Sequence, residues 1–378
     1  MGKKHAIFLT LGIYPGGKTR TATEVRAQQN LAALRALDYE ITVVTLPDPE
    51  QRSLEGQVIF VEPPPASHFV RLHFCCRYRR KIQRQVSRLA TTPDTIIFCE
   101  HWAALLCAPR HLRVIYSFHD FESNLITVRR SRKSSSVTWK TRAYWRLASW
   151  LERRLLRRAT RVISVSASEA AKLKSEWNVP AKYIPTVPFA EPSAMGEFNS
   201  SSLRLWFYGS SGATSNKVML DHLAGELFKP LQTALPGAEF HQVGTFNTYD
   251  AGTIAWLQQH FKMHGFVEDP ATLLQPGDIC LMPYQQDTGF RTKIPELCGY
   301  GMIPAGYEAT FACCPEMRDG FNCIMARDPA QLVQKLVQLQ TDEPARRRLA
   351  ANAFETRKTD FSFATLLEKY RGALQFPS

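Results

Sequence analysis

The chain has 378 residues, of which 44% are hydrophobic and 21% charged, a composition typical of soluble globular proteins. This length suits two domains of about 150–200 residues each. No apolar run reaches the roughly 18–20 residues that a membrane-spanning helix needs, which argues against an integral membrane protein. The net charge of +13 favours anionic partners.

The first predicted element is a buried strand at residues 5–12. Lysines and an apolar stretch open the chain, as in a signal peptide, but the stretch is short and runs into a Gly-rich turn. The nine cysteines are scattered and lack the spacing of a zinc site, so we interpret them as free thiols in a reducing compartment. Both observations predict a cytoplasmic protein.

Strands and helices then alternate through the first half of the chain. A helical pattern over 23–37 leads to a β-branched strand at 41–46. Further short apolar runs follow, separated by helical patterns, at 95–100, 113–120 and 161–166. Apolar runs without alternation are typical of parallel strands that helices cover on both faces. The order predicts a parallel α/β domain.

The segment 129–161 is the most basic part of the chain, with twelve Lys or Arg and one acid, Glu152. A smaller basic cluster lies at 71–84. Aromatic residues stand among the cations of the longer segment, at Trp139, Tyr144, Trp145 and Trp150. We interpret 129–161 as a helix pair whose basic face lies on an anionic membrane surface, at the inner face of the membrane. An ordinary solvated helix face is the alternative.

A Pro-, Ser- and Gly-rich stretch at 185–202 predicts the linker between two domains. Strand patterns resume after it at 203–212, 238–244, 262–267, 278–284 and 301–307. Helical patterns intervene at 218–234, 254–261, 293–300 and 329–340. We therefore predict an N-terminal domain over 1–190 and a C-terminal domain over 191–360, followed by a helix at 361–378 that could return to the first domain.

The segment 287–297 carries the residues best suited to chemistry. A nucleotide-diphosphate leaving group needs cations to stabilise its growing charge, and a carboxylate is well suited to binding ribose hydroxyls. Arg291 and Lys293 follow the predicted strand at 278–284 and open a helix, and Glu296 lies one turn further on. Pro295 is compatible with a helix only within its first turn. If each of these residues is considered alone, the alternative interpretation is a surface charge that caps an ordinary helix.

The stretch 289–306 resembles the nucleotide-sugar-binding segment of retaining GT-B glycosyltransferases, in the large group 1 or family four type. One branch of that family carries Arg-x-Lys-x-x-Glu followed by a small-residue helix and a glycine, which match Arg291, Lys293, Glu296 and Gly301. Weaker motifs match in order along most of the chain: Gly16-Gly17, 118–122, 162–168, Tyr208-Gly209, Asn216-Lys217, 265–267, 273–274, Asp278 and Pro283. The resemblance implies two Rossmann-like α/β domains facing a central cleft, and a hexosyltransferase-type enzyme.

The resemblance also implies roles for single residues. His119 follows the predicted strand 113–118, at the carboxyl end where α/β folds build their sites, and it would touch the donor sugar. His119, Arg291 and Lys293 are the expected catalytic residues. The donor-binding residues implied are Gly17, Gly209, Lys217, Phe266, Val267, Thr288, Gly289, Phe290 and Glu296. The donor would be a nucleotide sugar such as a UDP- or GDP-sugar, and the acceptor a glycan, a lipid-linked sugar or a small molecule.

The chain departs from the family pattern after Glu296, where Cys298-Gly299-Tyr300 replace the usual small Ala-rich turn, and at a second position. Many family members carry two glutamates eight positions apart, and the first falls on Thr288 here, next to Asp287. No Asp-x-Asp pair is present to hold Mg²⁺ or Mn²⁺ on a diphosphate, so we expect no metal and no other cofactor.

Two other functions stay open at this stage. A nucleotide-sugar epimerase on the same fold would share donor binding but would need no acceptor. A non-enzymatic basic protein would bind membrane or nucleic acid through 129–161 in a salt-sensitive way, although we expect nucleic acid less than membrane.

Overall fold

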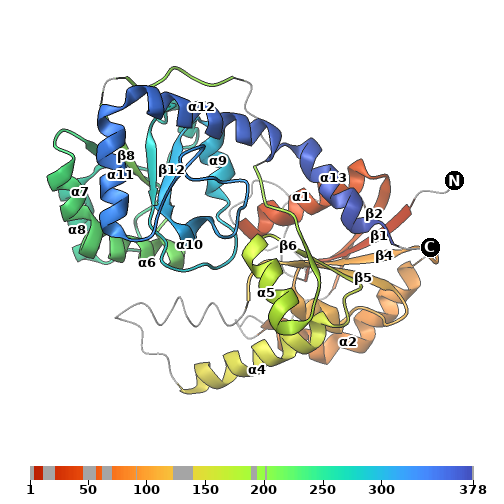
Figure 1. Cartoon of the computed structure of the whole chain (residues 1–378). Coiled ribbons are helices and arrows are strands. Elements are labelled where there is room, and N and C mark those ends of the chain that lie inside the picture. Colours follow the sequence, from red (N-terminus) through yellow and green to blue (C-terminus); the bar gives the residue numbers. More distant parts are fainter. Residues whose placement is uncertain are drawn as a thin grey trace. The chain divides into compact units, whose positions relative to one another are not determined.

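The computed structural model describes residues 4–11, 22–45, 57–61, 70–90, 92–121, 139–188, 194–200 and 202–376. These residues form two compact units. The first unit contains the described residues up to 188 together with 363–376, and the second contains those from 194 to 362. Each unit is described by itself below (Figure 1).

The first unit is built on a seven-stranded parallel sheet with the order β3-β2-β1-β4-β5-β6-β7. Its central strands are almost wholly buried apolar runs, as parallel pairing between two helical layers requires. The strands are β1 (Lys4–Leu9), β2 (Tyr39–Thr45), β3 (Gln57–Phe60), β4 (Ile96–Cys99), β5 (Arg113–Phe118), β6 (Arg161–Ser164) and β7 (Ala181–Tyr183).

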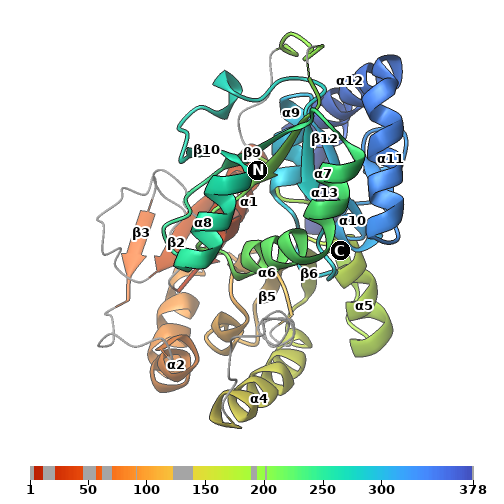
Figure 2. The ribbon, with the colours of Figure 1, turned by 90° about the vertical axis from the view of Figure 1, so that its left-hand side faces the viewer.

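Helices cover both faces of this sheet. The 3₁₀ helix η1 (Trp102–Leu106) packs against α2 (Val70–Leu89) and α4 (Trp139–Leu156) on one face, and α1 (Ala22–Ala36) packs against α13 (Phe363–Leu374) on the other (Figures 1 and 2). The remaining helix, α5 (Ala167–Trp177), lies between β6 and β7 in the chain. None of the helices in the described ranges is long and apolar enough to span a bilayer.

The second unit repeats the design with a six-stranded parallel sheet in the order β10-β9-β8-β11-β12-β13. Its strands are β8 (Arg204–Tyr208), β9 (Glu239–Val243), β10 (Lys262–Gly265), β11 (Ile279–Met282), β12 (Ile303–Tyr307) and β13 (Ile324–Ala326). Its helices are α6 (Thr214–His222), the π segment η2 (Leu223–Leu227), α7 (Phe228–Ala234), α8 (Ala251–His260), η3 (Pro270–Thr272), α9 (Lys293–Gly299), α10 (Glu308–Phe311), α11 (Pro329–Thr341) and α12 (Glu343–Thr359).

The prediction of two Rossmann-like α/β domains is confirmed. In both sheets the strand order reverses beside the first strand, between β1 and β4 and between β8 and β11. Ligands of open α/β sheets bind outside the carboxyl ends of the strands at such reversals. The residues directly after β1, β4, β8 and β11 are therefore the ones positioned to form a site, and β5 is the strand next to β4.

Some expectations differ from the structure. The helical pattern at 218–234 begins earlier, at Thr214, and contains the π segment η2. The helix pair expected over 129–161 is represented by the single helix α4, because 129–138 lie outside the described residues. The short strands β3, β7 and β13 were not predicted, since runs of three or four residues give little periodic signal.

Candidate active site

Lys293 is the centre of a polar cluster at the carboxyl ends of β8 and β11. Its ammonium group donates to the backbone oxygen of Tyr208, to Asn216 Oδ1 at 3.1 Å and to the hydroxyl of Tyr284 at 3.2 Å. The Tyr284 hydroxyl donates to the same Asn216 Oδ1 at 2.8 Å, and Asn216 Nδ2 donates to the Ser210 oxygen at 2.9 Å. One lysine thus connects β8, α6, the segment after β11 and its own helix α9.

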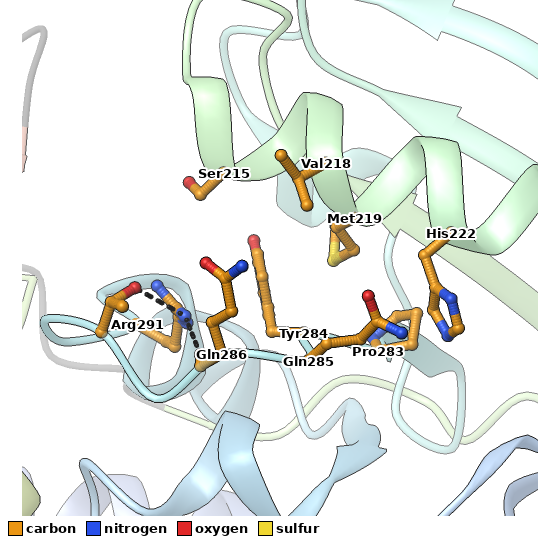
Figure 3. A pocket seen from close by; sticks show the side chains of 10 residues that line it. Ser215, Val218, Met219, His222, Pro283, Tyr284, Gln285, Gln286 and Arg291 are labelled. Atoms are coloured by element: carbon orange, nitrogen blue, oxygen red, sulfur yellow. Dashed lines mark hydrogen bonds between the residues drawn. The ribbon is translucent and has the colours of Figure 1, made fainter. Parts of the chain in front are cut away.

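Arg291 lies beside this cluster and lines a small pocket with α6 (Figure 3). Its Nη2 donates to the Gln286 oxygen at 2.8 Å and to Thr288 Oγ1 at 3.4 Å. The guanidinium carbon lies 4.1 Å from the centroid of the Tyr284 ring, within cation–π range. Thr288, which is buried, thus contacts one side of the Arg291 guanidinium.

The partners of these cations are all neutral. Lys217, on α6, donates to the Thr248 oxygen at 2.7 Å. Among the described residues, no carboxylate forms an ion pair with Lys217, Arg291 or Lys293. Hydrogen bonds to neutral oxygens fix the position of a cation without cancelling its charge. The cluster therefore presents net positive charge, which suits an anionic ligand.

Glu296 is the one acid in the cluster. The Tyr208 hydroxyl donates to its Oε1 at 2.7 Å. Burial raises the pKa of Glu296 above its usual range, and the Tyr208 hydrogen bond and the charge of Lys293 oppose this rise. Burial and the neighbouring Glu296 carboxylate raise the pKa of Tyr208, so Tyr208 keeps its proton and acts as the donor. This hydrogen bond fixes the Glu296 carboxylate through Oε1 and leaves Oε2 able to accept a hydrogen bond from a ligand.

The backbone after β8 must pass very close to the cluster. A Cβ atom at Gly209 would lie 2.7 Å from Asn216 Nδ2 and 2.9 Å from Lys293 Nζ. Gly244, after β9, has φ +118°, and a Cβ there would lie 2.5 Å from the Gly209 oxygen. Glycine is required at Gly244, where φ is positive and the neighbour is backbone. At Gly209 a Cβ would instead displace the ends of the Asn216 and Lys293 side chains.

The other predicted donor-binding residues of this unit occupy two places. Phe266 and Val267 follow β10, and Phe266 is 69% exposed, which leaves its ring accessible for stacking. Gly289 has φ +57° and, with the half-buried Phe290, precedes Arg291 in the loop after β11. Pro295 lies in the first turn of α9, where its missing N–H costs nothing.

His119 follows β5 in the first unit, at the carboxyl end as predicted. Its Nε2 lies 2.9 Å from Oε2 of Glu100, which directly follows the neighbouring strand β4. The Glu100 side chain is fully buried, whereas that of His119 is 23% exposed. A carboxylate can only accept, so Nε2 carries the proton in this contact. The lone pair of the neutral ring is then on Nδ1.

A buried hydrogen-bond network fixes Glu100 through Oε1, the carboxylate oxygen that does not contact His119. Asn30 Nδ2 donates to Glu100 Oε1 at 2.5 Å and to Ser117 Oγ at 3.1 Å. The Tyr370 hydroxyl, from α13, donates to Asn30 Oδ1. Arg26 is fully buried, and its Nε donates to the same Ser117 Oγ at 3.3 Å. The position of Glu100 is therefore set by α1, β5 and α13 together.

Sequence analysis missed Glu100, although the signal was present. Glu100 is an acid at the end of a buried apolar run, as His119 is a histidine at the end of the next. The partners Tyr208, Asn216 and Tyr284 were also not assigned these roles. Gly16, Gly17 and Glu122 lie outside the described residues. Within the described residues, no group of three or more His, Cys, Asp or Glu side chains could hold a metal ion.

Two family models match the chain, one in each unit. The model described as Glycosyltransferase Family 4 matches residues 23–188, and the model described as Glycosyl transferases group 1 matches residues 203–342. A search of curated protein sequences gave no match.

Solved structures with the same fold cover 78–98% of the chain at 12–14% identity. Sucrose-phosphate synthase from Thermosynechococcus elongatus is 13% identical with a TM-score of 0.71, over 98% of each chain. HepE from Anabaena, in complex with UDP-glucose, is 14% identical with a TM-score of 0.63, over 98% of this chain and 99% of that one. A variant of S. aureus TarM, in complex with Fondaparinux, alpha-GlcNAc-glycerol and UDP, is 12% identical with a TM-score of 0.58, over 78% of this chain and 58% of that one.

These likenesses show the GT-B fold with its two Rossmann-like domains, and one glycosyltransferase model matches within each domain. Together, the fold and the two matched models support a GT-B glycosyltransferase of the group 1 type, an enzyme of the hexosyltransferase class.

Proposed function

We propose that this glycosyltransferase moves a sugar from a nucleotide-diphosphate donor to an acceptor hydroxyl, with retention of configuration and without a metal ion. The observation that supports this most is the cation cluster after β8 and β11. Arg291 and Lys293 are fixed by neutral partners and keep their charges. Permanent cations held in this way stabilise the charge that develops on a departing diphosphate.

The reaction can be written with these groups. The bond between the anomeric carbon and the diphosphate oxygen breaks, and its electron pair stays on the diphosphate beside Arg291 and Lys293. The acceptor oxygen bonds to the anomeric carbon on the same face, and its proton passes to the departing diphosphate oxygen. His119 contacts the donor sugar through Nδ1, because Glu100 occupies Nε2. Glu100 is thus a positioning residue for His119.

Binding of the nucleoside would use the remaining residues. Glu296, oriented by Tyr208, accepts from the ribose hydroxyls through its carboxylate. The exposed ring of Phe266 stacks on the base, and Val267 lies beside it. A UDP-sugar is the first donor to test, because HepE is similar in fold and its structure holds UDP-glucose. The acceptor would contain a sugar or a glycerol unit, since the TarM structure holds a sugar linked to glycerol.

The exposed face of α4 supports a membrane-bound acceptor. Trp139 is 74%, Leu147 52% and Trp150 56% exposed. Exposed arginines share the helix with them, including Arg142 and Arg146. Interfacial helices combine cations with large apolar side chains in this way. We expect the protein to sediment with anionic vesicles at low salt and the Trp139→Ser/Trp150→Ser variant to lose most of this binding; equal sedimentation of the two would contradict the assignment.

A nucleotide panel tests the donor site directly. Wild type and Glu296→Ala are heated with UDP, GDP, ADP and TDP, with Glu343→Ala as a control, because Glu343 forms only an exposed pair with Arg347. A ligand at about one hundred times its Kd stabilises the folded state by about 2.7 kcal/mol. We expect one nucleotide to raise the Tm of wild type and of the control, but not of Glu296→Ala. Absence of any response in wild type would overturn the proposal.

A further inference from the structure

A groove in the first unit has no part in the proposed reaction. It lies between the second half of α2 and the residues just before β5, and its volume is about 460 Å³, within the range of about 300–1,000 Å³ typical of ligand pockets. The lining is mainly cationic, and the charged and titratable members are Arg79, Arg80, Arg84, Arg88, Arg110 and His111. We call this feature the α2 groove.

The α2 groove is built on a fixed frame. Gln83 Nε2, on the α2 side, donates to the Leu106 oxygen at 2.9 Å, which ties α2 to the end of η1. Ile82 and Val86 of α2 are fully buried, and Pro109 in the opposite wall is buried as well. The two walls are therefore held together by the core and do not depend on a ligand for their positions.

Nothing in the described part of the chain neutralises the charge of the groove. Five of its lining side chains are arginines, no lining residue is an acid, and none of these arginines forms an ion pair with a described carboxylate. Arg80, Arg84 and Arg88 are spaced four residues apart, so they lie along one line of the helix and repel one another. Like charges kept together at a cost to the helix indicate a function that needs them.

The positive charge of the groove acts on the neighbouring residue Arg158. Its Nη2 donates to the Ala108 oxygen at 3.0 Å, behind the wall formed by Pro109 and Arg110. Its pKa is lowered, first by burial and then by the positive charges of Arg79 and Arg110. Arg79 on α2 and Arg110 on the opposite wall therefore both lie near Arg158.

The location separates the α2 groove from the donor site. Arg110 and His111 precede β5, which begins at Arg113, whereas His119 follows its end at Phe118. Six residues of strand extend about 20 Å. A donor sugar that contacts His119 therefore leaves the groove empty.

We propose that the α2 groove is a binding site for a multiply charged phosphate ligand, of the kind that a diphosphate or a phosphomonoester lipid headgroup presents. The guanidinium groups of Arg80, Arg84 and Arg88 match phosphate oxygens in paired, parallel hydrogen bonds, and Arg110 and His111 approach from the opposite wall. A bound phosphate ligand relieves the repulsion among the arginines. A ligand with a single diffuse charge does not neutralise the five arginines of the α2 groove.

The test measures binding of inorganic pyrophosphate by calorimetry in an Arg291→Ala/Lys293→Ala background, which removes the donor site from the measurement. The groove variant is Arg80→Gln/Arg84→Gln/Arg88→Gln. A control with the same charge change, Arg347→Gln/Arg348→Gln/Lys358→Gln, alters exposed residues of α12 instead. We expect the groove variant to lose at least tenfold in affinity and the control less than threefold. Equal losses in the two, or no binding in the parent background, would overturn the proposal, whatever the nucleotide panel shows.

Vesicles then identify the source of the phosphate. Phosphatidylcholine vesicles containing 20% phosphatidic acid are compared with vesicles of equal charge made with phosphatidylglycerol, which has no phosphomonoester. If the groove takes a headgroup, the protein prefers phosphatidic acid, pyrophosphate competes, and the groove variant loses the preference. If the ligand is soluble, pyrophosphate binds with the same dependence on the groove and no such lipid preference exists. Tighter binding of sulfate than of pyrophosphate at equal ionic strength would contradict both sources.

Discussion

The contact between Glu100 and His119 allows a substitution that changes one proton and almost no volume. In Glu100→Gln, the amide oxygen should stay opposite Asn30 Nδ2, which is a donor and lies 2.5 Å from Oε1. The NH₂ group then takes the place of Oε2, 2.9 Å from His119 Nε2. An amide NH₂ only donates, so His119 must give up the proton on Nε2 and carry it on Nδ1. The atom offered to the donor sugar changes from an acceptor to a donor.

The structure sets the size of the expected effect. A hydrogen bond to a charged group contributes about 1.5–3 kcal/mol, and about 1.36 kcal/mol corresponds to a tenfold change in rate. Glu100→Gln should therefore lower kcat by about 10- to 150-fold. The KM for the donor should change by less than about threefold, since nucleotide binding is assigned to the other unit. Stability should change little, because the volume of the side chain and the bond from Asn30 are kept.

The assay is nucleotide release from the donor sugar, run from about pH 5.5 to 9, with Tm measured on the same samples. Glu152→Gln is the matched control: Glu152 is also a fully buried glutamate of the first unit, but it lies on α4. The control should affect Tm and leave kcat within about twofold. A kcat for Glu100→Gln within threefold of wild type, at unchanged Tm, would show that His119 does not act through the proton on Nε2.

Two further predictions concern the second unit. Gly209→Ala should abolish stabilisation by the nucleotide while the protein still folds, because the new Cβ would lie 2.7 Å from Asn216 Nδ2 and 2.9 Å from Lys293 Nζ and displace both; a normal thermal shift would refute this. Burial lowers the pKa of His241 to about 4, so below about pH 6.5 the unfolded chain binds a proton that the folded chain does not, and the free energy of unfolding should fall by at most about 3 kcal/mol between pH 6.5 and 4. Urea titrations should show a smaller loss in His241→Gln than in wild type, because burial also lowers the pKa of His264 and of His5 and these two contribute in both proteins. The lowered pKa of Glu239 adds a separate loss below about pH 4.5 in both.

The sequence predicted most of the sheet because parallel strands covered on both sides are apolar runs, and such runs stand out between helices. It predicted His119 and Arg291 because polar side chains at the carboxyl ends of those runs have few structural reasons to be there. The partners that hold them were not predicted. Asn30 lies 70 residues before Glu100, and Tyr370 lies 340 residues after Asn30. A local pattern carries no information on such pairs, since only the fold of the whole unit brings them together.

Ion pairing with a carboxylate distinguishes the cations that stabilise the fold from the cations that are available to a ligand. Arg204 lies 2.6 Å from Asp278, whose carboxylate is fully buried, so its charge is neutralised within the protein and serves the second sheet. Lys293 is equally well bonded, but only to neutral oxygens, and its charge persists. Arg84 of the α2 groove is exposed and has no carboxylate partner among the described residues. A chain with 47 basic and 34 acidic residues cannot pair every cation, and the unpaired ones could have been spread evenly over the surface. Among the described residues, Lys293 and the arginines of the α2 groove instead lie where the backbone and neutral side chains fix the surrounding geometry, which is the arrangement expected when the missing negative charge is supplied by a ligand.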